Sequence, residues 1–173
     1  KHVQRMKPTT QLVTRLMAVL LLTMVAAITA RAATALNGKV VLRPLTPQEL
    51  KDPALAGAQG ASGLDTVGIG QPAYLDALVN SEIDPTNIVG VVWSLTSKPL
   101  GSVAVLTNSH LGPNIPIYEM KDRASFQIAR PNGRYVLFPD VAGQYTVSAT
   151  ITTTIPNGTV TVTQNITAGT YVG

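Results

Sequence analysis

Residues 144–154 constrain the fold of this chain more than any other segment, because apolar and hydroxyl side chains alternate along them. Every second residue from Tyr145 to Ile151 is apolar, and threonine or serine occupies the positions between. Successive side chains of a β-strand point to opposite faces, so the pattern predicts a strand with one buried and one wet face. Residues 159–163 and Ile166 are also β-branched and follow a Pro-Asn-Gly turn at 156–158, which predicts an antiparallel hairpin.

Other short segments of apolar and β-branched residues precede this hairpin. The predicted strands lie at residues 38–43, 73–79, 88–96, 103–106, 125–129 and 134–138. A second Pro-Asn-Gly turn at 131–133 predicts that the last two of these strands form another hairpin. Residues 54–70 and 108–122 are predicted loops. Thr-Pro-Gln-Glu at 46–49 is a capping box, which predicts one short helical turn. Short strands separated by turn signals predict an all-β fold, either an antiparallel sandwich or a barrel.

Two aromatic residues favour the sandwich. Trp93 lies in the segment 88–96, which is expected to be a central strand, and Tyr145 follows the corner sequence Phe-Pro-Asp-Val-Ala-Gly at 138–143. In immunoglobulin-like sandwiches a Trp packs between the sheets, and a corner Tyr bonds through its hydroxyl to the backbone upstream. The predicted core residues are Leu75, Trp93, Tyr145 and Val147, and the predicted corner residues are Asp140 and Gly143. The alternative is another β fold in which the same two aromatics are buried.

Residues 66–167 resemble a PKD/REJ-type immunoglobulin-like module of secreted bacterial proteins. The resemblance lies in Val-Gly-Ile-Gly-Gln-Pro at 67–72 with Leu-Asp-Ala at 75–77, in Trp-Ser-Leu-Thr-Ser-Lys-Pro at 93–99 and in the corner at 138–145. It implies an immunoglobulin-like (PKD-type) antiparallel β-sandwich, with Leu75 and Val147 at the inter-sheet positions that cysteines occupy in antibody domains. Two departures are the turn at 84–87, which lacks the family's glycine, and the long link at 109–134, which has room for an extra hairpin or a partner-binding loop.

The first 32 residues are typical of a secretory signal peptide. Basic residues precede an apolar run at 16–28, and Ala-Arg-Ala at 30–32 fits the cleavage pattern. The run is shorter than the ~20 residues of a spanning helix, and an uncleaved anchor is the alternative. The predicted organisation is a signal peptide at 1–32, a strand, helical turn and Gly/Ala-rich loop at 33–65, the sandwich at 66–167 and the start of a linker at 168–173. We therefore expect a secreted, periplasmic or cell-surface protein that meets a membrane only through the signal peptide during export.

Composition narrows the classes of partner and cofactor. The formal net charge is +4, but five of the thirteen basic residues lie in the first 31 positions, so eight basic residues remain against nine acidic ones. This balance argues against a nucleic-acid partner. The chain has no cysteine, which excludes thiol catalysis, Cys-ligated zinc and haem attachment within these 173 residues. No cofactor is expected within the chain.

Candidate catalytic and metal-binding residues do not form a known pattern. His110 is the only histidine after the signal peptide, and its neighbour Ser109 is not part of a nucleophile elbow. Glu119, Asp122 and Asp140 lack the alternating carboxylates of a calcium loop. Asp140 is instead expected to bond nearby backbone. Arg130 and Arg134 flank a turn and are expected to form a solvated rim. The sequence therefore predicts a non-enzymatic protein.

Three functions remain open. The first is a spacer, adhesion or protein-interaction module of a larger envelope protein, with a protein or polysaccharide as partner. The second is an N-terminal accessory domain of a secreted multihaem c-type cytochrome, because residues 168–173 are similar to the linker before a haem-binding Cys-x-x-Cys-His. The third is a carbohydrate-binding module, which would need Tyr74, Tyr118 and Tyr135 to gather on one exposed face.

Overall fold

The computed structural model describes residues 34–55, 65–112, 114, 116 and 125–170, and the predicted signal peptide at 1–32 lies outside these residues. The described residues fold as β-strands with three single 3-10 turns: η1 (Glu49–Lys51), η2 (Pro53–Leu55) and η3 (Pro85–Asn87). In the part of the chain that is described, no helix has the length and hydropathy needed to cross a lipid bilayer. The chain is all-β, as the sequence predicted.

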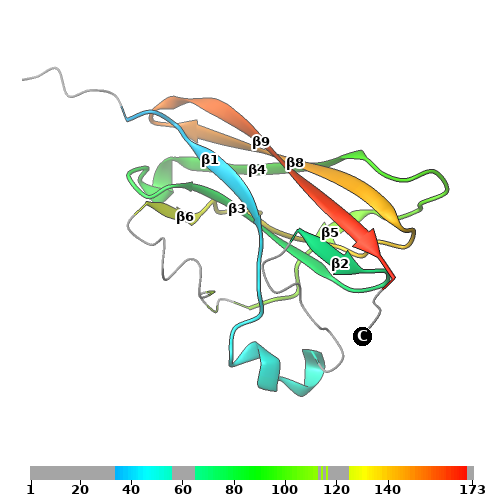
Figure 1. Ribbon diagram of the computed structural model, residues 1–173. Helices are drawn as coiled ribbons and strands as arrows, with labels where there is room; N and C mark the ends of the chain where they lie inside the picture. Colours follow the sequence, from blue (N-terminus) through cyan, green and yellow to red (C-terminus); the bar gives the residue numbers. More distant parts are fainter. Residues whose placement is uncertain (1–33, 56–64, 113, 115, 117–124, 171–173) are drawn as a thin grey trace, which may run out of the picture. The chain divides into compact units, whose positions relative to one another are not determined.

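The strands form two sheets (Figure 1). The first sheet has the order β1 (Gly38–Leu42), β3 (Ala73–Asn80), β7 (Arg134–Leu137), β5 (Leu106–Asn108), and β6 (Phe126–Ile128) also pairs with β3. The second sheet has the order β2 (Thr66–Gly68), β9 (Asn157–Gly169), β8 (Gly143–Thr154), β4 (Ile88–Ser97). All pairs are antiparallel except β2 with β9. This arrangement is compatible with a β-sandwich.

An apolar core holds the two sheets together. Strands β3 and β8 contribute its fully buried centre, which includes Ala73, Leu75, Ala77, Val79, Tyr145, Val147, Ala149 and Ile151. Each of these residues lies two positions from the next on its strand, so one face of each strand supplies the core. Packing of this kind between two sheets is mainly driven by the removal of apolar surface from water. Leu75, Tyr145 and Val147 are therefore central to the core.

The outer face of β8 and β9 is a polar surface, as the alternation predicts. Thr150 lies opposite Thr161, and their hydroxyl oxygens are 2.9 Å apart. Thr146 donates a hydrogen bond of 3.0 Å to the side-chain oxygen of Asn165 on β9. Cross-strand pairs of this type stabilise an antiparallel sheet and leave the remaining hydroxyl capacity to water.

Three elements differ from the sequence-based expectation. The strand expected at 103–106 begins only at Leu106. Strand β2 lies within the predicted loop 54–70, because a strand of three residues is too short to show an alternation of apolar and polar side chains. The segment 88–96, expected to be a central strand, forms β4 at the end of its sheet. Its apolar composition resembled a fully buried strand, but Val89 and Val92 are 57% and 71% exposed.

The corner before β8 is organised around the Tyr145 hydroxyl. This oxygen accepts a hydrogen bond of 3.1 Å from the Val141 amide and lies 2.9 Å from the Val141 carbonyl. It is also 3.1 Å from a carboxylate oxygen of Asp140. The ring is fully buried, so these contacts satisfy a polar group that has no access to water.

Asp140 connects this corner to the loop that follows β4. Its carboxylate accepts a hydrogen bond of 2.5 Å from the Ser102 hydroxyl and one of 2.7 Å from the Val103 amide. We expected bonds to nearby backbone, but the amide that Asp140 accepts from is 37 residues away. Gly143 belongs to the same junction, because a Cβ there would lie 2.8 Å from the Pro99 ring.

Tyr145→Phe is expected to lower the free energy of unfolding by about 1–2 kcal/mol, because it leaves the Val141 amide and carbonyl without their buried partner. Urea denaturation of the purified protein measures this change. Tyr135→Phe is the matched control, since the Tyr135 ring packs on Trp93 and its hydroxyl makes no hydrogen bond within the described residues. Equal effects of the two variants would show that the corner hydroxyl contributes nothing specific.

Asp140→Asn is expected to reduce the acid sensitivity of the protein. The hydrogen bonds from Ser102 and then from the Val103 amide lower the pKa of Asp140 from 3.8 to about 2. A lowered folded-state pKa stabilises the protein above the unfolded value, and this stabilisation is lost as pH falls from about 4 to about 2. The stability difference between wild type and Asp140→Asn should therefore shrink over that interval in urea titrations. A difference that stays constant with pH would contradict this assignment.

Candidate functional site

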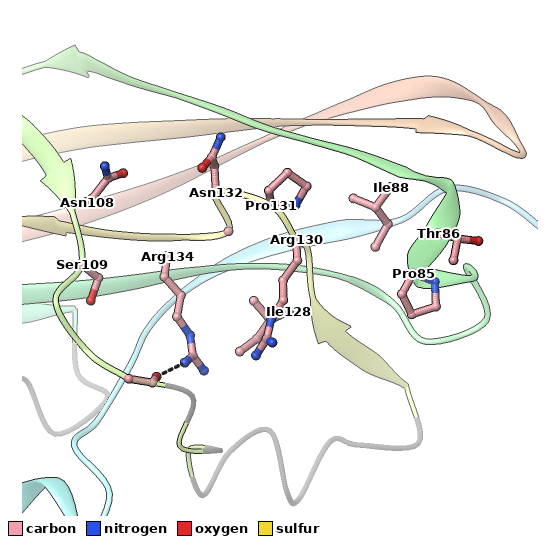
Figure 2. Close-up of a pocket in the computed structure, with 12 residues that line it drawn as sticks. Pro85, Thr86, Ile88, Asn108, Ser109, Ile128, Arg130, Pro131, Asn132 and Arg134 are labelled. Atoms are coloured by element: carbon pink, nitrogen blue, oxygen red, sulfur yellow. Dashed lines mark hydrogen bonds between the residues drawn. The ribbon is translucent and has the colours of Figure 1, made fainter.

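A groove of about 670 Å³ opens between the turn before β4, the end of β5 and the turn before β7 (Figure 2). Its polar lining residues are Thr86, Asn108, Ser109, Arg130, Asn132 and Arg134. Its apolar lining residues are Pro85, Ile88, Ile128 and Pro131. Sites for small ligands typically occupy ~300–1,000 Å³ and combine apolar walls with a few convergent polar groups. The groove has both properties and is the candidate binding site.

The first wall of the groove is the 3-10 turn η3. Asp84 precedes this turn, and one of its carboxylate oxygens accepts hydrogen bonds from the amide (2.9 Å) and the hydroxyl (2.7 Å) of Thr86. Hydrogen bonds from the Thr86 hydroxyl and amide lower the pKa of Asp84 below its ordinary value. Pro85 fixes the first position of the turn. This wall is therefore a short, capped segment rather than an open loop.

The second wall is the turn between β6 and β7. Hydrogen bonds from Ala129 N to Ala77 O and from Ala77 N to Gly133 O attach this turn to β3. A Cβ at Gly133 would lie 1.8 Å from the Ala129 carbonyl oxygen, so only glycine fits there. Asn132 has a φ of 63°, in the left-handed region that asparagine tolerates. The hairpin expected from the Pro-Asn-Gly sequence is wrong here, because β6 and β7 both pair antiparallel with β3 and run in the same direction, so residues 129–133 are an insertion between them and not a chain reversal. Close packing explains the glycine of this turn.

Trp93 connects the core to this turn. Its ring is half-buried, stacks on Tyr135 with centroids 5.4 Å apart, and packs against the inter-sheet core. Its indole N–H donates a hydrogen bond of 2.7 Å to the Asn132 carbonyl. Tryptophan commonly packs its apolar ring against a core while its N–H finds a hydrogen-bond partner. Trp93 therefore fixes the backbone of a turn that lines the groove.

Arg134 forms the back of the groove and is firmly held. Its guanidinium donates to the carbonyls of Gly112 (2.6 Å) and Asn114 (3.2 Å), and its Nε lies 3.3 Å from Asp76. Figure 2 shows the bond to Gly112 as a dashed line. The expectation of a solvated rim was wrong for Arg134, because its side chain is only 13% exposed.

Behind Arg134 lies a buried charge network made of Arg43, Glu49, Asp76 and Arg134. Arg43 is bidentate to Glu49 at 2.9 and 2.8 Å, and its Nε is 3.7 Å from Asp76. Arg43, Glu49 and Asp76 are at most 4% exposed. The network contains two positive and two negative groups, so their formal charges cancel. Buried charges persist only when they are paired and hydrogen-bonded in this way.

The predicted capping box is confirmed and is part of this network. The Thr46 amide donates to Glu49 (2.8 Å), and the Glu49 amide donates to the Thr46 hydroxyl (3.2 Å). Burial alone would raise the pKa of Glu49, but hydrogen bonds from Arg43 and Thr46 and the charge of Arg43 outweigh it and lower this pKa below its ordinary value. Glu49 therefore remains ionised and fixes Arg43 in place.

Residues close in sequence to this network also cover the outer face of β3. Leu45, Leu111 and Val136 pack around Tyr74 in a second apolar cluster, and every residue of β3 is buried. The Tyr74 hydroxyl lies 3.1 Å from Nε2 of His110. Burial and then the charge of Glu49 raise the pKa of Tyr74. His110 thus contacts a buried tyrosine, and Tyr74 is not available for an exposed aromatic surface.

The groove offers one exposed positive charge. Arg130 makes no ion pair or side-chain hydrogen bond with any residue in the described ranges, and no carboxylate belongs to the described residues that line the groove. In Figure 2 the side chains of Arg130 and Arg134 extend in the same direction from the turn. Sequence reasoning placed Arg130 on a solvated rim and did not foresee the groove beside it. The arrangement suits binding of an anionic group next to apolar surface.

The remaining candidate residues are placed as follows. Asp140 and Gly143 lie at the corner before β8, away from the residues that line the groove. Tyr118, Glu119 and Asp122 lie outside the described residues. Among the residues that are described, no three His, Cys, Asp or Glu side chains are grouped as metal ligands.

Glu49→Gln is expected to lower the free energy of unfolding by about 3 kcal/mol, because it removes the charge that compensates buried Arg43. Chemical denaturation at neutral pH measures the loss. Glu82→Gln, which removes an exposed carboxylate, should change stability by less than about 0.5 kcal/mol. If Glu49→Gln behaved like this control, the network would not depend on the Arg43–Glu49 pair.

Comparison with known proteins does not supply a family for this chain. No protein-family model matches it, and no curated protein matches it either. The inference about function therefore depends on the fold, the groove and the sequence features at the N-terminus.

Proposed function

We propose that this chain is an exported, immunoglobulin-like module of PKD type that binds another protein and catalyses no reaction. Its strand order supports the fold assignment. In the constant-type immunoglobulin sandwich one sheet has the order A-B-E-D and the other contains C, F and G. The order β1-β3-β7-β5 corresponds to the first, and β4, β8 and β9 in the second sheet correspond to the other. The Tyr145 corner is a further point of agreement.

Export is supported by the sequence of the first 32 residues, and the Thr-rich outer face of β8 and β9 suits an extracytoplasmic protein. A cysteine-free domain of this size buries enough surface to fold without disulfides. We therefore place the module in the periplasm or at the cell surface, as a spacer, adhesion or interaction part of a larger envelope protein.

The groove is the observation that carries the binding role. One wall is a turn attached to β3 by backbone hydrogen bonds, the other is a capped 3-10 turn, and loops held on a scaffold of this kind commonly carry recognition. A prearranged site loses little conformational entropy when a ligand binds. Polar side chains and an exposed guanidinium converge on apolar residues there.

Two other roles have weaker support. The cytochrome accessory role rests on the similarity of residues 168–173 to a linker and would place the haem outside this chain. A carbohydrate-binding role would need exposed aromatics, but Tyr74 is buried and Tyr135 is stacked on Trp93.

The proposal is tested by site-specific photocrosslinking on intact cells. Because the chain has no cysteine, Asn108→Cys places one thiol at the groove and Thr163→Cys places one on the polar outer face of β9. A membrane-impermeant maleimide crosslinker should label both variants, which tests export. The groove variant should capture one protein at least about tenfold more efficiently than the control. Absence of labelling would overturn export, and equal capture or no capture would overturn groove-mediated protein binding.

A further inference from the structure

The charge in the groove is concentrated on one residue. Arg134 is paired with Asp76, which also lies near Arg43, so its charge is compensated inside the protein. Arg130 is exposed and has no such partner within the described residues. The nearby carboxylate of Asp84 bonds to Thr86 and does not line the groove. Among the described residues that line the groove, Arg130 is therefore the single uncompensated cation that a ligand would meet.

The chemistry of guanidinium selects the anion. Arg presents its N–H donors as a planar fork, which matches the two oxygens of a carboxylate. The backbone beside Arg130 is fixed, because Ala129 bonds to β3 and Asn132 accepts the Trp93 indole N–H. The base of the side chain is thus held in place before a ligand binds, which reduces the entropy cost of forming such a pair.

The rest of the lining indicates what should accompany the carboxylate. Ile88, Ile128, Pro85 and Pro131 provide aliphatic surface, and no aromatic ring lies among the described lining residues. Sugar rings commonly pack on aromatic faces, whereas aliphatic side chains and proline pack well on Ile and Pro. The side-chain amides of Asn108 and Asn132 can both donate and accept hydrogen bonds, as the backbone of an extended peptide requires.

We propose that the groove binds an extended acidic peptide segment of a partner protein, with a Glu or Asp carboxylate on Arg130 and a neighbouring aliphatic or Pro side chain on the apolar residues. This ligand class rests on the proposed function, because it names what the partner presents to the groove. The volume of about 670 Å³ suits a short segment rather than a folded domain.

Capped peptides test the proposal with the purified full chain. The probe is a fluorescent library with a central Glu flanked by Ile, Val or Pro, and the matched library carries Gln in place of Glu. We expect fluorescence anisotropy to show at least about tenfold tighter binding of the Glu library, since hydrogen bonds to charged groups are the stronger class. Added salt should weaken this binding.

Arg130→Ala should weaken binding of the Glu library about tenfold or more and should leave binding of the Gln library nearly unchanged. Arg130→Lys retains the charge without the fork and should recover only part of the loss. Lys51→Ala is the control, because it removes an exposed cation on η1, outside the lining residues. Thermal unfolding of all three variants should match wild type, since both side chains are exposed.

Equal binding of the Glu and Gln libraries would overturn the proposal, as would equal effects of Arg130→Ala and Lys51→Ala. Binding of an acidic oligosaccharide in place of peptides would overturn the peptide assignment. If crosslinking captures a protein at the groove but acidic peptides do not bind, the ligand class is wrong and the protein-binding role stands. If crosslinking captures nothing, the protein-binding role fails first.

Discussion

The burial of Asp76 is the constraint on which much of this structure depends. Strand β3 is buried on both faces, and Asp76 is the one charged residue within it. A carboxylate without access to water is tolerated only beside cations. Arg43 and Arg134 supply these cations from β1's end and from β7, and Glu49 in turn compensates Arg43. Asp76 therefore connects the segment that covers β3, the turn η1 and the back of the groove through one charge network.

The two arginines near the groove differ in whether they belong to this charge network. Arg134 is oriented by Asp76 and by the carbonyls of Gly112 and Asn114, so it serves as a fixed wall. Arg130 lies four residues earlier, before the turn, and has no partner of this kind within the described residues. Two arginines that flank the same turn thus differ in function because only one of them reaches the buried carboxylate. The selectivity of the groove for an anionic ligand is expected to come from Arg130, which stabilises no other described part of the fold.

Sequence patterns predicted the parts of the fold that depend on local chemistry. The alternation that begins at Tyr145 located β8, and the Pro-Asn-Gly sequence at 156–158 located the hairpin between β8 and β9. The same sequence at 131–133 does not reverse the chain, because β6 and β7 both pair antiparallel with β3 and therefore run in the same direction. Patterns could not show that β4 ends its sheet, because strand order depends on contacts between distant residues. They also missed the groove, which joins residues from three separate turns. A signal was present in Arg43 and Asp76, which are charges within apolar segments, but only the fold shows that they meet.

Trp93 shows why the core and the groove cannot be treated as separate parts. The strand and corner motifs assigned it to the core, and its half-buried ring packs against that core, but its polar edge bonds to the Asn132 carbonyl on the turn that lines the groove. The position of that turn then depends on how the Trp93 ring packs against the core, and not only on the conformational propensities of the turn residues. A change that shifts the ring would move Pro131 and Asn132 without touching any ligand. The packing between the two sheets and the geometry of the groove are therefore coupled through one hydrogen bond. A variant that weakens the core near Trp93 is expected to change ligand binding at the groove as well as the free energy of unfolding.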